Sequence, residues 1–123
     1  MILADTSVWV AHLRDGTIGL DSLLMEGQVI THPFIIGELA CGNLKYRSEI
    51  LTLLNALPMA TQAEHEEVMQ FIENHSLMGR GLGFIDMHLL VSATLSAVSL
   101  WTLDKKLNQV SSQLAIAYYP SPP

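Results

Sequence analysis

The sequence predicts a single α/β domain, a three-layer α/β/α sandwich around a central, mainly parallel sheet. Three observations lead to this prediction. Short apolar runs alternate with helix-like segments along the chain. These runs are apolar on both faces, as expected for parallel strands covered by helices on each side. The 123 residues, without a repeat or a linker, fit one domain of about 100–200 residues. We place the domain at residues 1–119 and a loose, proline-rich tail at 120–123.

The first half of the chain begins with a strand and a helix. Residues 2–4 form a short apolar run, and the hydroxyls of Thr6 and Ser7 suit the N-cap of a helix over 8–13. Pro33 fits the first turn of a helix that ends near Gly42. The remaining elements predicted in this half are a helix over 20–25, a strand over 28–31 and a helix over 47–55.

The second half continues the alternation. Residues 58–60 form a short edge strand, and Thr61 caps a helix over 62–74. A glycine-punctuated loop over 76–83 leads to a helix that begins at Phe84. The last predicted elements are a strand over 99–103 and a strand over 114–117.

Composition excludes several classes of protein. Half of the residues are hydrophobic and only 15% are charged, which is the opposite of a disordered chain. The net charge of −6 excludes a basic coat for nucleic acid. The mean hydropathy of +0.34 is high for a chain of this size, so we expect another protein to cover part of its surface.

The compartment follows from the N-terminus and from cysteine use. The first residues lack a basic leader, and the single cysteine, Cys41, cannot form an internal disulfide. Residues 87–103 are uncharged but fall short of the about 18–20 residues that span a bilayer, and we interpret them as a buried helix and strand. We therefore expect a cytoplasmic protein that does not associate with membranes.

Four carboxylates stand in apolar sequence, where an ionised group needs a partner because desolvation is costly. Two of them end predicted strands and one begins a predicted helix. The fourth lies about five residues into its helix, ~7–8 Å along the axis, which is within reach of a Glu side chain. Because strand ends and helix starts share the carboxyl edge of a parallel sheet, we expect all four to converge there. They are Asp5, Glu38, Asp86 and Asp104.

Such a cluster predicts a metal site. Like charges held together raise their own pKa values, and a divalent cation removes this repulsion. Oxygen ligands without His or Cys favour Mg²⁺ or Mn²⁺ over Zn²⁺, and such an ion equips a site for phosphodiester hydrolysis. The alternative is that Asp5 and Asp104 cap helices, Asp86 benefits from a helix dipole, and Glu38 lies on a half-exposed helix.

Four stretches around these acids resemble PIN-domain ribonucleases, and more narrowly the VapC-type toxins of toxin–antitoxin pairs. The resemblance covers nearly the whole chain and agrees in order and spacing. The stretches are residues 1–9, 35–39, 83–90 and 100–107.

The resemblance implies a PIN-like fold and an Mg²⁺-dependent endoribonuclease that hydrolyses RNA with metal-activated water. It implies that the four acids are at once the catalytic and the metal-binding residues, and that Thr6, Ser7 and Thr102 support them. The family often has a further acid after the fourth one, whereas here Lys105 and Lys106 follow.

The resemblance also implies partners. It predicts a homodimer inhibited by an antitoxin whose tail enters the acidic groove, often with an Arg near the metal, and contact with DNA only indirectly through that antitoxin. Possible contacts to RNA or to the antitoxin are Arg80, Arg14 and Lys105.

Two other functions remain open from the residues alone. A receiver-type phosphoacceptor domain is also a small α/β protein with acids at strand ends, but it needs an acceptor Asp where residues 58–60 have none. A PIN-like fold that keeps its acids but only binds, without turnover, is the second alternative.

Overall fold

A parallel sheet forms the centre of the molecule. The computed structural model describes residues 1–120, and in this part of the chain three strands occur in the order β2-β1-β3. They are β1 (Ile2–Ala4), β2 (Val29–Ile30) and β3 (Ser99–Trp101). Both neighbours of β1 run parallel to it, with Leu3 opposite Ile30 on one side and Leu100 on the other. The predicted parallel α/β architecture is therefore confirmed.

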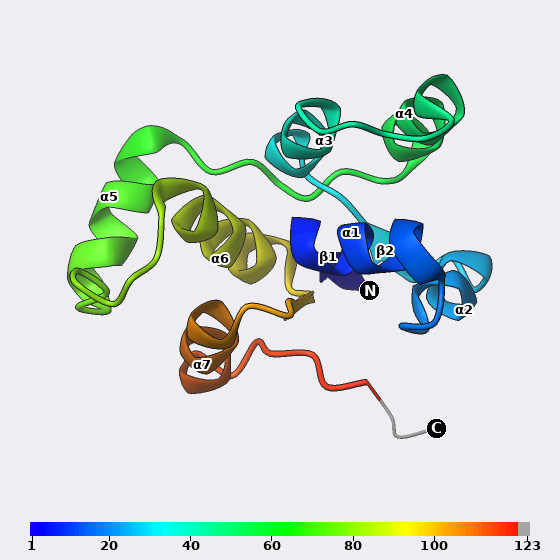
Figure 1. Cartoon of the computed structure of the whole chain (residues 1–123). Helices are drawn as coiled ribbons and strands as arrows, with labels where there is room; N and C mark the ends of the chain where they lie inside the picture. The colour runs from blue at the N-terminus through cyan, green and yellow to red at the C-terminus, as the bar shows by residue number, and fades with distance from the viewer. Residues whose placement is uncertain (121–123) are drawn as a thin grey trace.

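Helices surround this sheet on all sides (Figure 1). The helices within residues 1–120 are α1 (Thr6–Asp15), α2 (Leu20–Met25), α3 (Pro33–Ala40), α4 (Arg47–Ala56), α5 (His65–Asn74), α6 (Phe84–Ser96) and α7 (Lys105–Gln113). Helix α1 contacts α2 and α3, and α3 contacts α4. Helix α6 packs along β3 and against α5.

The sheet is buried on both faces, as expected for parallel strands between helices. Leu3, Ala4 and Leu100 are inaccessible to solvent, and the two tryptophans, Trp9 on α1 and Trp101 on β3, fill the largest volumes of the core. This packing fixes where β1 and β3 end, and therefore where the residues that follow them are placed.

The predicted starts of two helices were wrong. The cap of α1 is the carboxylate of Asp5, which accepts from the Thr6 N–H, rather than a hydroxyl. Helix α5 begins at His65 instead of residue 62, because the Glu67 side chain accepts from the Glu64 N–H at the helix start. The Thr61 N–H instead donates to the Ser96 hydroxyl.

The edges of the sheet are shorter than predicted. The expected strands over 58–60 and 114–117 are single parallel bridges, from Met59 to Thr31 and from Ala117 to Leu100. Helix α7 occupies a segment for which neither a helix nor a strand was predicted. Of the predicted tail at 120–123, only Pro120 lies within the described residues.

No helix in residues 1–120 combines the length and the apolar character that crossing a bilayer requires. The uncharged stretch over 87–103 is divided between the C-terminal part of α6 and β3, as predicted.

Candidate active site

Three of the four carboxylates lie at helix starts, and the fourth lies further along its helix. Asp5 follows β1 and caps α1, and Asp104 follows β3 and caps α7. Because β1 and β3 are adjacent and parallel, with Ala4 opposite Trp101, both strands end at the same edge. Asp86 lies in the first turn of α6, and Glu38 lies in the second turn of α3.

Asp5 is the buried centre of the group, with only 7% of its surface exposed. Its Oδ1 accepts a hydrogen bond from the Thr6 N–H at 2.7 Å. Its Oδ2 accepts from the hydroxyls of Ser7 at 2.9 Å and Thr102 at 2.7 Å. These donors compensate the ionised carboxylate for lost water and leave it in one orientation.

Two threonines connect Asp5 to two of the other acidic residues, one through a carboxylate and one through a backbone N–H. The Thr6 hydroxyl donates to Glu38 Oε1 at 2.7 Å, while the N–H of the same residue donates to Asp5. The Thr102 hydroxyl donates to Asp5 and accepts from the Asp104 N–H at 3.1 Å. The residues that the family resemblance named as supports therefore form a continuous network between three of the four acids.

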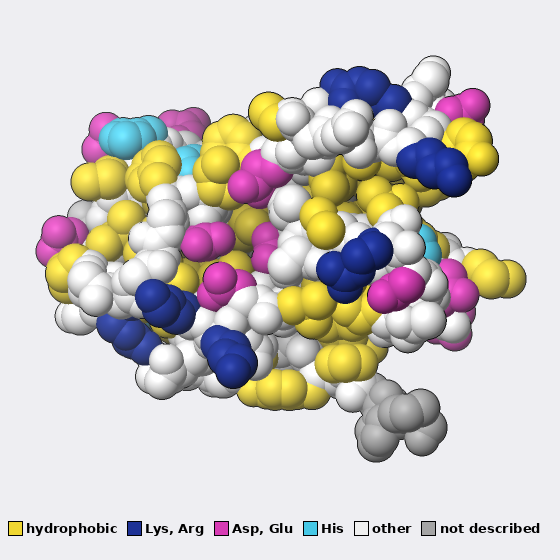
Figure 2. Space-filling view, in the orientation of Figure 1, with side chains coloured by type: hydrophobic (Ala, Val, Ile, Leu, Met, Phe, Trp, Pro, Cys, Tyr) yellow, Lys and Arg dark blue, Asp and Glu magenta, His cyan; other side chains and the backbone are white. Residues whose placement is uncertain are grey.

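Asp86 shares no hydrogen-bond donor with the other three acids, but their charges affect its pKa. Burial raises the pKa of its carboxyl, and the Gly83 N–H, which donates to Oδ2 at 3.1 Å, opposes this rise. The negative charges of Asp5, Asp104 and Glu38 raise the pKa further. The charges of all three acids therefore act on Asp86. Figure 2 shows acidic side chains near the middle of the visible face.

The donor chemistry of this group fits a hard divalent cation. All four side chains offer carboxylate oxygens, and their mutual repulsion is what a cation would relieve. In the described residues, no three His, Cys, Asp or Glu side chains close into a ready coordination shell. Each of the four carboxylates instead accepts hydrogen bonds from protein donors.

Basic side chains surround the acids at some distance. The Arg14 guanidinium lies 3.8 Å from Asp15 and is largely exposed, in a groove of about 570 Å³ that Thr6 and Glu38 also line. Arg80 donates to the Gln113 side chain at 3.0 Å, which ties the loop before α6 to α7. Lys105 is exposed beside Asp104. All three predicted contact residues are therefore accessible.

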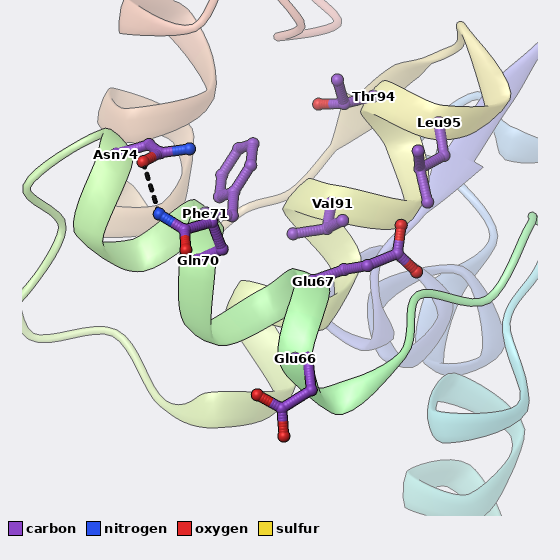
Figure 3. A pocket seen from close by; sticks show the side chains of 8 residues that line it. All are labelled: Glu66, Glu67, Gln70, Phe71, Asn74, Val91, Thr94 and Leu95. Carbon is purple, nitrogen blue, oxygen red and sulfur yellow. Dashed lines mark hydrogen bonds between the residues drawn. The ribbon is translucent and has the colours of Figure 1, made fainter.

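A second hollow lies between α5 and α6 and contains none of the four acids (Figure 3). Phe71, Val91 and Leu95 make it apolar, and Glu66 and Glu67 lie at its edge. Glu66 and Glu67 are exposed, so they behave as solvated surface acids.

Fold and site together define a class: a small parallel α/β domain that collects acidic residues at the carboxyl edge of its sheet. The model of the PIN domain family matches residues 2–113. The chain therefore belongs to the PIN-domain family. It is 41% identical over 118 residues to a protein named Ribonuclease VapC32 in two strains of Mycobacterium tuberculosis, H37Rv and CDC 1551, and the match covers 95% of each chain. Within the family it is thus of the VapC type.

A solved structure supports the same fold. The crystal structure of PAE2754 from Pyrobaculum aerophilum superimposes with a TM-score of 0.59 and covers 93% of this chain and 88% of its own. At 18% sequence identity this likeness concerns the fold alone.

Thr102 offers a test of how the acids are positioned. Thr102→Val keeps the shape of the side chain but removes the bridge between Asp5 and the Asp104 N–H. We expect the free energy of unfolding to fall by about 1–3 kcal/mol in urea titrations, because a buried carboxylate loses a donor. We also expect divalent-cation affinity to fall about 10- to 100-fold by calorimetry. Thr102→Ser, which restores the hydroxyl, should recover the affinity, and an affinity that Thr102→Val leaves intact would show that the bridge has no positioning role.

His32, which precedes α3, makes stability depend on pH. Burial and, to a smaller extent, the neighbouring charge of His88 together lower the pKa of its imidazole to about 4. Its Nδ1 accepts from the Phe34 N–H at 3.0 Å, so the folded state needs the neutral ring. Between pH 6.5 and about pH 4, this histidine binds a proton in the unfolded chain but not in the folded chain.

Stability should therefore be full above pH 6.5 and fall by about 3 kcal/mol as the pH drops to about 4. Denaturant unfolding at a series of pH values measures this. His32→Asn keeps a cap acceptor and does not titrate, so its stability should vary less over this range. An equally steep decline in that variant would assign the effect to other groups.

Proposed function

We propose that this chain is a metal-dependent endoribonuclease, the toxin component of a type II toxin–antitoxin pair. The observation that supports the proposal is the network in which Thr6 joins Asp5 to Glu38 and Thr102 joins Asp5 to the Asp104 N–H, with the charges of these acids acting on Asp86. The relative at 41% identity, named a ribonuclease, supports RNA as the substrate.

The four acids are the proposed holders of Mg²⁺, with Mn²⁺ as a possible substitute. A bound divalent ion lowers the pKa of its water and stabilises charge on a phosphoryl oxygen. Asp5 contributes a fixed, buried negative charge, because three donors hold its two oxygens. Glu38 and Asp104 are exposed at the edge, on the side from which a substrate approaches.

The basic residues are the proposed partners of RNA phosphates or of the antitoxin. Arg14 lies in the groove that begins at Thr6 and Glu38, and Arg80 and Lys105 lie on the side of α7. Phosphate binding depends mainly on such residues, so we expect binding that weakens with salt. We also propose that the chain forms a homodimer, is inhibited by an antitoxin and is located in the cytoplasm.

The end groups of the products test the reaction. Incubation of the chain with 5′-labelled single-stranded RNA and Mg²⁺ should give discrete fragments. A metal-activated water does not need the neighbouring 2′-hydroxyl, so the fragments should carry no 2′,3′-cyclic phosphate. Cyclic ends would assign the cleavage to another mechanism or to a contaminant, and RNA that is bound but left uncut would favour the alternative of a silent binding module.

A further inference from the structure

Five aromatic rings form a continuous ladder beside the acidic group. His32 packs on Phe34 with ring centroids 4.9 Å apart, and Phe34 meets His88 edge-on at 4.9 Å. His88 in turn meets Phe84 edge-on at 4.8 Å, and Phe84 contacts His65 at 5.5 Å. The ladder thus joins the starts of α3, α5 and α6, which lie far apart in the sequence.

The ladder combines buried and exposed rings. His32 and His88 are buried, with 1% and 7% of their surfaces accessible. Phe34 and Phe84 are exposed at 38% and 43%, although phenyl rings are strongly hydrophobic. Two buried imidazoles therefore hold two phenyl rings at the surface in fixed orientations.

The exposed rings lie on the same helices as two of the four acids. Phe34 precedes Glu38 by one helical turn on α3, so both side chains share a helix face. Phe84 lies in the same first turn of α6 as Asp86. Figure 2 shows hydrophobic and histidine side chains gathered beside the acidic side chains.

We propose that Phe34 and Phe84 form a stacking platform for bases of single-stranded RNA next to the phosphodiester that is cut. This inference rests on the proposed function. Every base offers a π-face, so stacking on aromatic rings binds single strands with little sequence preference. The platform therefore predicts that the substrate is single-stranded or unpaired RNA.

Charge explains why such a platform suits this site. The chain carries 12 acids against 6 basic residues, so it gains little of the counterion-release energy that drives most RNA binding. Stacking adds affinity that depends only weakly on salt. It also holds the RNA strand close to the acidic edge of the sheet, although the carboxylates there repel the phosphates. An aliphatic surface would serve a protein partner equally well, whereas exposed aromatic faces at a phosphodiester-cleaving edge favour bases.

The binding test uses Phe34→Leu and Phe84→Leu, which keep apolar volume but remove the π-face. In an Asp5→Asn background, which leaves RNA uncut, fluorescence anisotropy with a labelled single-stranded RNA should show an affinity about 10-fold weaker for each change. Phe34→Trp and Phe84→Trp should retain the affinity. The slope of affinity against salt should stay constant, because no charge changes. Tyr119→Leu, which removes an exposed ring near the end of α7, is the matched control and should have no effect.

Kinetics in the wild-type background separate binding from chemistry. The Leu variants should raise KM by the same factors and leave kcat within about twofold. Melting temperatures must stay near that of the wild type, and an affinity lost in the Trp variants as well would assign the rings a structural role and overturn the proposal.

Two further outcomes would also overturn it. Unchanged RNA affinity in the double Leu variant would do so, while cleavage by the wild type would leave the proposed function intact. Unchanged affinity together with dissociation of a dimer in sedimentation would identify the rings as a protein interface. Failure of the wild-type chain to cut any RNA would instead refute the proposed function, whatever the affinities.

Discussion

Asp5→Asn should abolish RNA cleavage, with a loss of at least about 100- to 1,000-fold in kcat, while the protein stays folded. The substitution keeps the size of the side chain and an oxygen that caps α1, but it removes the negative charge at the centre of the network. Initial rates of cleavage of a labelled RNA measure the loss, and circular dichroism verifies the fold.

Asp15→Asn is the matched control for this change. Asp15 ends α1, the helix that Asp5 begins, but it is exposed and its carboxylate accepts from Thr17 rather than from the site. Its neutralisation should leave the rate unchanged. Equal loss in both variants would point to overall charge, and full activity of Asp5→Asn would remove the acids from the mechanism.

Removal of divalent cations should stop cleavage completely, and Mg²⁺ or Mn²⁺ should restore it. The physical reason is that burial, and then the charges of the other three acids, raise the pKa of Asp86, and a bound cation would favour its ionised form. Titration of the chelated protein with each ion, with cleavage as the readout, gives the dependence.

The same titration should raise the melting temperature, because an ion that binds only the folded state stabilises it. Asp5→Asn should show a much smaller rise, which ties the stabilisation to this site. Cleavage that continues in excess chelator would contradict the metal-dependent function directly.

The sequence was sufficient to predict the three central strands and the edge at which two of the acids lie. The apolar residues at 2–4 and at 100–101 favour buried strands, and adjacent parallel strands end at one edge. The convergence of Asp5 and Asp104 followed from this rule alone. Their assignment as metal ligands remains a proposal that the Mg²⁺ and Asp5 experiments test.

Other features depended on contacts that no local pattern reveals. Thr61 and Glu64 were both suitable residues to precede α5. The helix begins at His65 because the Glu67 side chain accepts from the Glu64 N–H, whereas the Thr61 N–H donates to Ser96. Helix α7 was missed because its short polar sequence is helical only with Asp104 as a cap and Leu107 in the core. These choices are made by tertiary packing.

The aromatic ladder could not be predicted from the sequence. Its rings come from the starts of three helices, and no sequence spacing indicates that Phe34 and Phe84 both contact His88. His88 lies in a buried helix, as expected, but its observed partners are two phenyl rings.

Anomalous diffraction from crystals grown with Mn²⁺ tests the central claim most directly. We predict a strong peak enclosed by oxygens of Asp5, Glu38, Asp86 and Asp104, and loss of that peak in Asp5→Asn crystals. Manganese bound elsewhere, with the four side chains still in their present hydrogen bonds, would contradict the proposed metal site.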